Sequence, residues 1–247
     1  VTSTAKITKA MQMVASSKMR RAQENAVAGR PYALQLNNVL AEVTRHAGDF
    51  THPLMEERRV KKRAVILAST DKGLCGALNS NLLREASEYD PATTVFVTAG
   101  RKASQFIART QRQLAAEFPY SDTPTFAEAR TIAKLAREIF EKHEVDAVDA
   151  LFTNFVNTLS QRPMKVTLLP ITEIKAVSTN LKIDVADTKL EPGLTEFLFE
   201  PDPASVLGAM LPQYLNFLMY QVLLEAKASE HSARMVAMKN ATENAKQ

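Results

Sequence analysis

The fold is decided by the stretch KITKAMQMVASSKMRRA, residues 6–22 of a chain of 247 residues. Apolar side chains recur in it at the spacing of one helix face, at Ile7, Met11, Val14 and Met19. The pattern continues to His46, so the sequence predicts a single helix over residues 4–46, roughly 60 Å long at 1.5 Å per residue. A helix of that length needs a packing partner, because helix propensity alone does not stabilise it.

Two features modify this picture of the first helix. Gly29-Arg30-Pro31 is where we expect a kink, since Pro31 has no backbone donor to continue the hydrogen-bond ladder. Lysine, arginine and methionine side chains also gather on the segment. We interpret it either as a helix with a Met-rich core face and a solvated basic face, or as a shaft that slides against a partner through adaptable Met contacts.

A second long helix is predicted over residues 204–247. Asp202 and Pro203 form a good helix start, because aspartate caps free backbone donors and proline suits the first turn. Beyond Gly208 the segment has no further glycine, and small residues after Leu224 allow close helix approach. The two terminal helices flank a compact middle, so we expect them to meet as an antiparallel coiled coil.

The middle of the chain alternates short apolar runs rich in β-formers with helical patterns. The expected strands are residues 63–70, 93–99, 147–156 and 165–171, and the expected helices are residues 77–89, 102–109 and 126–143. Strands that alternate with helices predict an α/β layer with a largely parallel sheet. The fold class is therefore α/β: a coiled coil of two long terminal helices (residues 1–58 and 196–247) and a central, Rossmann-like α/β layer domain (residues 59–195).

Charge and composition limit the classes of function. Residues 1–63 carry twelve Lys or Arg against five Asp or Glu, and the remainder carries nineteen against twenty-two. A basic segment attracts nucleic acid, anionic lipid or an acidic protein surface, and charge alone does not choose among them. The sequence contains no apolar run long enough to span a membrane. Its one cysteine cannot form an intramolecular disulfide.

The loop STDKGLCG, residues 69–76, follows the first expected strand and is the main candidate for chemistry. A strand, a glycine loop and a helix can cradle an anion, but the chain has no G-x-G-x-x-G or P-loop motif. We favour a tight turn with Cys75 packed inside. A nucleophilic Cys75 would need a histidine base, and none of the four histidines follows a strand. We predict no catalytic, cofactor-binding or metal-binding site.

Four motifs, in order, resemble the signatures of one family. They are KITKAM with MVASSKMR in residues 6–20, STDKGLCGALNSN in residues 69–81, FEP in residues 199–201 and SEHSARMVAM in residues 229–238. The chain is identified by them as similar to the gamma subunits of rotary ATP synthases. The resemblance spans nearly the whole chain and agrees with the architecture read from the residues.

The resemblance implies a non-catalytic central stalk that rotates inside a ring of alpha and beta subunits. It would couple proton flow through the c ring to ATP synthesis or hydrolysis on beta. By resemblance, Lys9, Met11 and Lys18 meet an acidic beta loop, with Glu230 and Arg234 nearby on the opposite helix. The epsilon subunit and c ring would contact Phe197, where the family usually has Tyr, and Glu200.

Several further expectations follow from the resemblance. They include no nucleic acid, no direct membrane insertion and no cofactor on this chain. The location would be peripheral, on the cytoplasmic face of a bacterial plasma membrane or the matrix or stroma side of an organelle membrane. The family's last helix also runs on past Gln247. Two other classes stay open: a nucleotide-binding α/β enzyme with a helical oligomerisation region, and a basic helical nucleic-acid binder.

Overall fold

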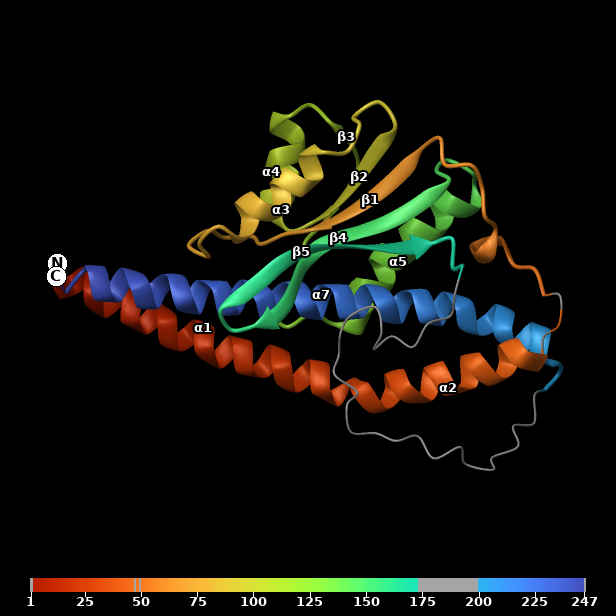
Figure 1. Ribbon diagram of the computed structural model, residues 1–247, viewed down its shortest axis with the longest axis horizontal. Coiled ribbons are helices and arrows are strands. Elements are labelled where there is room, and N and C mark those ends of the chain that lie inside the picture. The colour runs from red at the N-terminus through yellow and green to blue at the C-terminus, as the bar shows by residue number, and fades with distance from the viewer. Residues whose placement is uncertain (1, 47, 49, 173–199, 247) are drawn as a thin grey trace.

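The computed structural model describes residues 2–46, 48, 50–172 and 200–246, and it places a five-stranded sheet beside a long helical rod (Figure 1). The elements, in chain order, are α1 Thr2–Ala28, α2 Arg30–His46, the 3₁₀ turn η1 Pro53–Met55, β1 Arg63–Ala68, α3 Leu78–Ser87, β2 Thr94–Ala99, α4 Arg101–Arg109, β3 Gln113–Phe118, α5 Phe126–Glu141, β4 Ala147–Asn157, β5 Ser160–Leu169 and α7 Pro203–Asn244.

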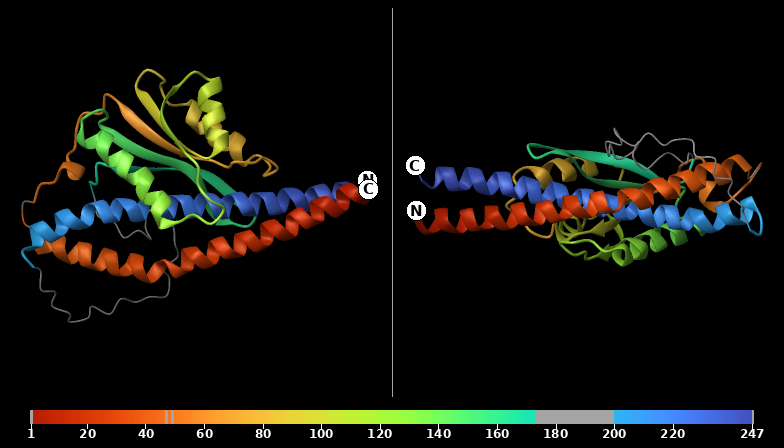
Figure 2. Two further views of the ribbon diagram at one scale, coloured as in Figure 1. Left: turned by 180° about the vertical axis from the view of Figure 1, so that it is seen from behind. Right: turned by 90° about the horizontal axis from the view of Figure 1, so that it is seen from below.

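Helices α1 and α2 run antiparallel to α7, which confirms the predicted pairing. The hydroxyls of Thr8 and Thr242 lie 2.7 Å apart, and the rings of Tyr32 and Phe217 lie 5.4 Å apart. The start of α1 therefore lies beside the end of α7, and the start of α2 lies beside an earlier part of α7, as in an antiparallel pair. The two ends of the described chain lie together at one tip of the rod, in both the front view and the view from below (Figures 1 and 2).

The expected kink falls at Gly29, which separates α1 from α2. Pro31 is the second residue of α2. A proline in the first turn removes no intrahelical hydrogen bond, because the first backbone donors of a helix have no partner in any case. The segment is thus two helices set end to end, where a single helix over residues 4–46 was expected.

The sheet has the strand order β3-β2-β1-β4-β5, with the first four strands parallel and β5 antiparallel to β4. The sequence analysis missed β3, an edge strand whose side chains are mostly exposed and show no apolar pattern. It also started the last strand too late, at residue 165. Residues 160–164 pair because Asn157 turns the chain into a hairpin, its side chain accepting bonds from the N–H groups of Leu159 and Ser160.

Side chains on the two faces of β1 pack into two different hydrophobic cores. Val65 and Leu67 pack with α3 and α4 in a small core on one face of the sheet. Ala64 and Ile66 belong to the main core on the other face, which includes α5, α2 and α7. This main core continues without a break from the sheet into the helical rod.

Helix α7 is buried on nearly all sides over its middle third. It begins as predicted, with the Asp202 carboxylate accepting the N–H of Ser205 at 2.9 Å. From Tyr214 to Ser232 almost every side chain is buried, because α1 and α2 cover one side while β4 and α5 cover the other. The helix therefore belongs to the coiled coil and to the α/β domain at once.

Glu225 of α7 has a carboxyl group that is largely shielded from solvent. Its carboxylate accepts the backbone N–H of Phe155 in β4 at 3.2 Å. Burial raises the pKa of Glu225 to about 7, and the bond from Phe155 opposes that shift only in part. A neutral glutamic acid is thus favoured in the folded state well above its ordinary titration range.

The raised pKa predicts a specific pH dependence of stability. Between about pH 4.5 and 7 the folded state binds more protons than the unfolded state, so the free energy of unfolding falls as pH rises. Glu225→Gln removes the titration and keeps an acceptor for Phe155. We expect the wild type to lose about 3 kcal/mol relative to this variant between pH 4.5 and pH 8, in urea unfolding of the isolated chain. Parallel pH profiles for the two proteins would contradict the assignment.

Candidate partner-contact surface

Exposed apolar side chains form a surface at the tip of the rod, between α1 and the loop after β1. Ile7 and Val14 of α1 are more than half exposed, as is Leu74 of the loop. Leu74 has φ +60°, a left-handed conformation that is uncommon for a leucine. Together with Met11 these side chains line a cavity of about 470 Å³. Exposed apolar groups gathered in this way are typical of a site that another molecule covers.

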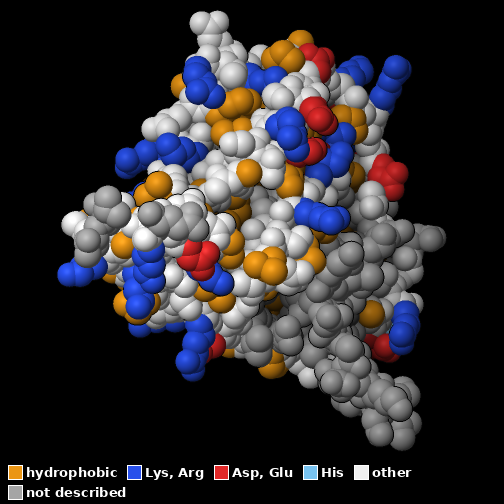
Figure 3. All heavy atoms as spheres, turned by 60° about the vertical axis from the view of Figure 1, so that its left-hand side comes forward, with side chains coloured by type: hydrophobic (Ala, Val, Ile, Leu, Met, Phe, Trp, Pro, Cys, Tyr) orange, Lys and Arg blue, Asp and Glu red, His pale blue; other side chains and the backbone are white. Residues whose placement is uncertain are grey.

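Cations surround this apolar surface. Lys18, Lys72 and Arg234 also line the cavity, together with a single acid, Asp122. The face seen when this end is turned forward shows many Lys and Arg side chains around apolar patches and fewer acids (Figure 3). The surface therefore suits an acidic partner that also carries apolar side chains.

Arg234 of α7 holds the loop of this surface in place. Its guanidinium donates to the backbone carbonyls of Lys72 and Gly73, each at 3.2 Å, and to the Glu230 carboxylate at 2.8 Å. One planar cation thus joins α7 to the loop that presents Leu74.

A buried charge cluster lies beneath Arg234. Glu230, which is almost fully buried, also accepts from Lys227 at 3.0 Å. The Lys227 ammonium sits 4.3 Å from the centre of the Tyr120 ring and 3.7 Å from Asp122. Buried charges are stable only when paired, so each member of the cluster fixes the position of the others.

Asp122 extends the cluster to the other helix of the rod. It accepts a hydrogen bond from Lys18 of α1, and this bond holds the pKa of Asp122 below its ordinary value, with Lys227 acting in the same direction. Both side chains are substantially exposed, so the pair itself contributes little stability. Its effect is to fix the loop before α5 between the two helices.

His231 lies at the inner wall of the cavity. Only 1% of the residue is exposed, and neither ring nitrogen makes a hydrogen bond of normal geometry with the described part of the chain. Burial lowers the pKa of His231, although Glu230 and the Asp122 backbone oppose the shift. A neutral ring is therefore favoured at this buried position.

The structure brings together four of the five residues predicted to contact beta subunits. Met11, Lys18 and Arg234 line the cavity, and Glu230 lies directly beneath Arg234. Lys9 is exposed on α1 but does not line the cavity.

Of the expected foot contacts, only Glu200 is among the described residues, and it lies at the other end of α7. Glu200 is exposed just before the helix begins. Helix α7 begins at Pro203, so Glu230 lies roughly 40 Å further along the helix at 1.5 Å per residue. Phe197 lies outside the described residues.

Sequence reasoning missed Lys227, Tyr120 and Asp122. One signal was available: the polar residues at positions 227, 230, 231 and 234 recur at the spacing of one helix face. Nothing in the sequence indicated that residues 120–122, about 110 positions away, would supply the partners.

The glycine loop of residues 69–76 is not arranged to hold a nucleotide. In open α/β sheets a ligand binds at the carboxyl ends of the strands. Here α7 lies against that edge: Ser229 donates to the carbonyl of Thr153 at 2.8 Å, and Arg234 takes the loop carbonyls. Cys75 is buried, which raises the pKa of its thiol and disfavours a nucleophilic thiolate. This agrees with a packed turn.

Comparison with known proteins assigns the family. A family model described as ATP synthase matches residues 1–247. The ATP synthase gamma chain of Opitutus terrae is 44% identical over 99% of this chain and 84% of its own length. That of Desulfitobacterium hafniense is 41% identical over 98% of this chain and 82% of its own length. The chain belongs to the ATP synthase gamma-chain family.

A solved structure agrees with this family. The central stalk and c ring of the Tetrahymena thermophila mitochondrial ATP synthase contains a chain with a TM-score of 0.67 and 25% identity. The match covers 98% of this chain and all of that one. The α1–α7 rod and its α/β domain thus have the architecture of an ATP synthase gamma chain. Among the described residues, no helix combines the length and the apolar character that crossing a bilayer requires.

The clamp made by Arg234 predicts a local effect of its removal. Arg234→Ala deletes the donors to the carbonyls of Lys72 and Gly73, so the loop should open more often. We expect trypsin to cut the Lys72–Gly73 bond about tenfold faster, since charge-assisted bonds contribute about 1.5–3 kcal/mol. Lys239→Ala, which removes an exposed cation from the same helix, is the matched control. Equal cleavage rates in the two variants would show that the clamp does not restrain the loop.

Proposed function

We propose that the chain is the non-catalytic central stalk of an ATP synthase, turning inside a ring of alpha and beta subunits. The proposal rests on the antiparallel packing of α1 against α7 in a chain that belongs to the gamma-chain family. Proton flow through the c ring would turn the rod, and ATP would be made or hydrolysed on beta. The chain itself needs no cofactor for this role.

The mechanism follows from the asymmetry of the rod. The α/β domain lies on one side of the coiled coil, as the view from behind shows (Figure 2). The apolar surface lies toward the end of the rod that holds the start of α1 and the end of α7. At any angle such a rod touches each subunit of a surrounding ring differently. Each catalytic site is then biased toward one conformation by its own contact energy, and rotation passes that bias around the ring.

The surface at the tip is the proposed contact with beta. Its cations, Lys18, Lys72 and Arg234, complement an acidic loop, and Ile7, Met11 and Leu74 offer apolar contacts. We place the contacts with epsilon and the c ring at the opposite end, near Phe197 and Glu200. The chain would then be a peripheral membrane protein on the side of the membrane that carries the catalytic head.

This assignment predicts that Met11→Lys uncouples the complex without unfolding the chain. The added charge lies in the cavity that the partner covers, so it should hinder the contact more than the fold. We expect the ratio of protons pumped to ATP hydrolysed to fall about fivefold or more in reconstituted vesicles. The thermal midpoint of the isolated chain should barely change.

Met13→Lys is the matched control for this prediction. Met13 lies two residues further along α1, is 60% exposed and does not line the cavity. It should leave the coupling ratio close to that of the wild type. Equal losses in the two variants would contradict the placement of the contact.

A further inference from the structure

The outer edge of β5 is long, and no strand among the described residues pairs with it. The strand has ten residues, lies at the margin of the sheet and pairs only with β4 among the described strands. The view from below places the β4–β5 hairpin at the outside of the molecule (Figure 2). An open edge of this length exposes backbone donors and acceptors that readily pair with another strand.

The register shows which backbone groups face outward. Pro163 is paired with Thr153, and proline has no N–H to give to β4. Pairing is continuous from Pro163 to Thr167, and orientation alternates along an antiparallel strand, so Lys165 and Thr167 share the orientation of Pro163. Their N–H groups point away from β4, whereas those of Met164 and Val166 bond to it.

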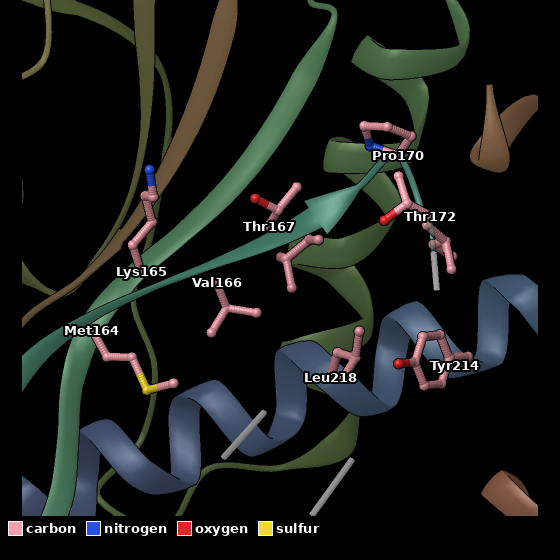
Figure 4. A pocket seen from close by; sticks show the side chains of 10 residues that line it. Met164, Lys165, Val166, Thr167, Pro170, Thr172, Tyr214 and Leu218 are labelled. Atoms are coloured by element: carbon pink, nitrogen blue, oxygen red, sulfur yellow. The ribbon is translucent and has the colours of Figure 1, made fainter. Parts of the chain in front are cut away.

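A hollow lies on each side of this edge. On the face toward α7, a cavity of about 260 Å³ is bounded by β5 and by Tyr214 and Leu218 (Figure 4). Met164 and Val166 point toward α7 there, and Lys165 and Thr167 point the other way (Figure 4). On the opposite face, Tyr89 and Pro163 help to line a cavity of about 300 Å³. An added strand gains affinity from main-chain bonds and specificity from alternate side-chain pockets of this kind.

The charged side chains of β5 indicate what kind of strand would pair with its outer edge. Arg162 and Lys165 are exposed, and neither has an ion-pair partner within the described residues. A second copy of β5 would bring the same cations together, which is unfavourable across a strand pair. Glu85 of α3 and Glu88 just after it line the same hollow as Lys165, so a strand with a carboxylate would be attracted mainly at Arg162.

We propose that β5 accepts an extended segment from a neighbouring subunit of the ATP synthase. The segment adds to the sheet as a sixth strand beside β5. It places an apolar side chain in the hollow beside Tyr214 and Leu218 and a carboxylate beside Arg162. This inference rests on the proposed function, because the partner is a subunit of that complex.

Residue-resolved hydrogen exchange of the isolated chain and of the assembled complex tests the proposal. The amides of Lys165 and Thr167 should exchange rapidly in the isolated monomer and at least a hundredfold more slowly in the complex. Met164 and Val166, whose amides face β4, are the internal controls and should be slow in both. Rapid exchange of Lys165 and Thr167 in the complex would overturn the proposal, as would slow exchange in the monomer.

The remaining outcomes separate the two proposals. Protection that appears only when the isolated chain self-associates would identify a second copy as the occupant and overturn a subunit strand. A chain that joins no ATP synthase complex would contradict the proposed function and this inference with it. A complex that forms with unprotected edge amides would contradict this inference alone.

A pair of variants checks the same edge. Lys165→Pro removes the outward donor at a position equivalent to Pro163, so the ladder to β4 should survive. Lys165→Ala removes the same charge but keeps the N–H. We expect Lys165→Pro to release the added strand, seen as rapid exchange of Thr167 in the complex, while Lys165→Ala keeps most of the protection. Equal protection in the two variants would count against main-chain pairing.

Discussion

The structure depends on the burial of α7 on two sides at once. Side chains such as Phe217 and Val222 belong to one core that also contains Val43 of α2, Ile66 of β1 and Phe140 of α5. Removing either the rod or the sheet would expose an apolar face of this helix to water. The free-energy cost is roughly 25 cal/mol for each Å² of apolar surface exposed. The coiled coil and the α/β domain are therefore one body. A torque applied to the domain is carried directly into the rod.

The polar contacts inside the molecule differ from those at its surface. Inside, Lys227, Glu230 and Arg234 make short, buried bonds that fix α7 to the loops at residues 72–73 and 120–122. Outside, Lys18 at the apolar surface is substantially exposed, and contacts made by exposed charges are individually weak, about 0–1 kcal/mol. A stiff interior with a weakly binding surface allows a rotor to hold its shape and still leave each contact.

Much of this was readable from the sequence, for physical reasons. The long helices, the kink near Pro31 and the cap at Asp202 follow from local chemistry, and the parallel strands follow from buried apolar runs. Strand β3 could not be predicted, because an exposed edge leaves no apolar pattern. At the contact surface, the family motifs indicated Met11 and Arg234. The pairing of Lys227 with Tyr120 depends on tertiary packing, which no local pattern encodes.

If this chain is the rotor of the ATP synthase, it must turn relative to the alpha and beta subunits. The most direct test attaches a fluorescent bead to a single cysteine introduced in the exposed β4–β5 turn, at Leu159, in a surface-immobilised complex with alpha and beta subunits. The sole native cysteine, Cys75, is buried and should stay unlabelled. The bead should rotate in one direction while ATP is hydrolysed. A bead that stays still while the same complex hydrolyses ATP would contradict the rotor role.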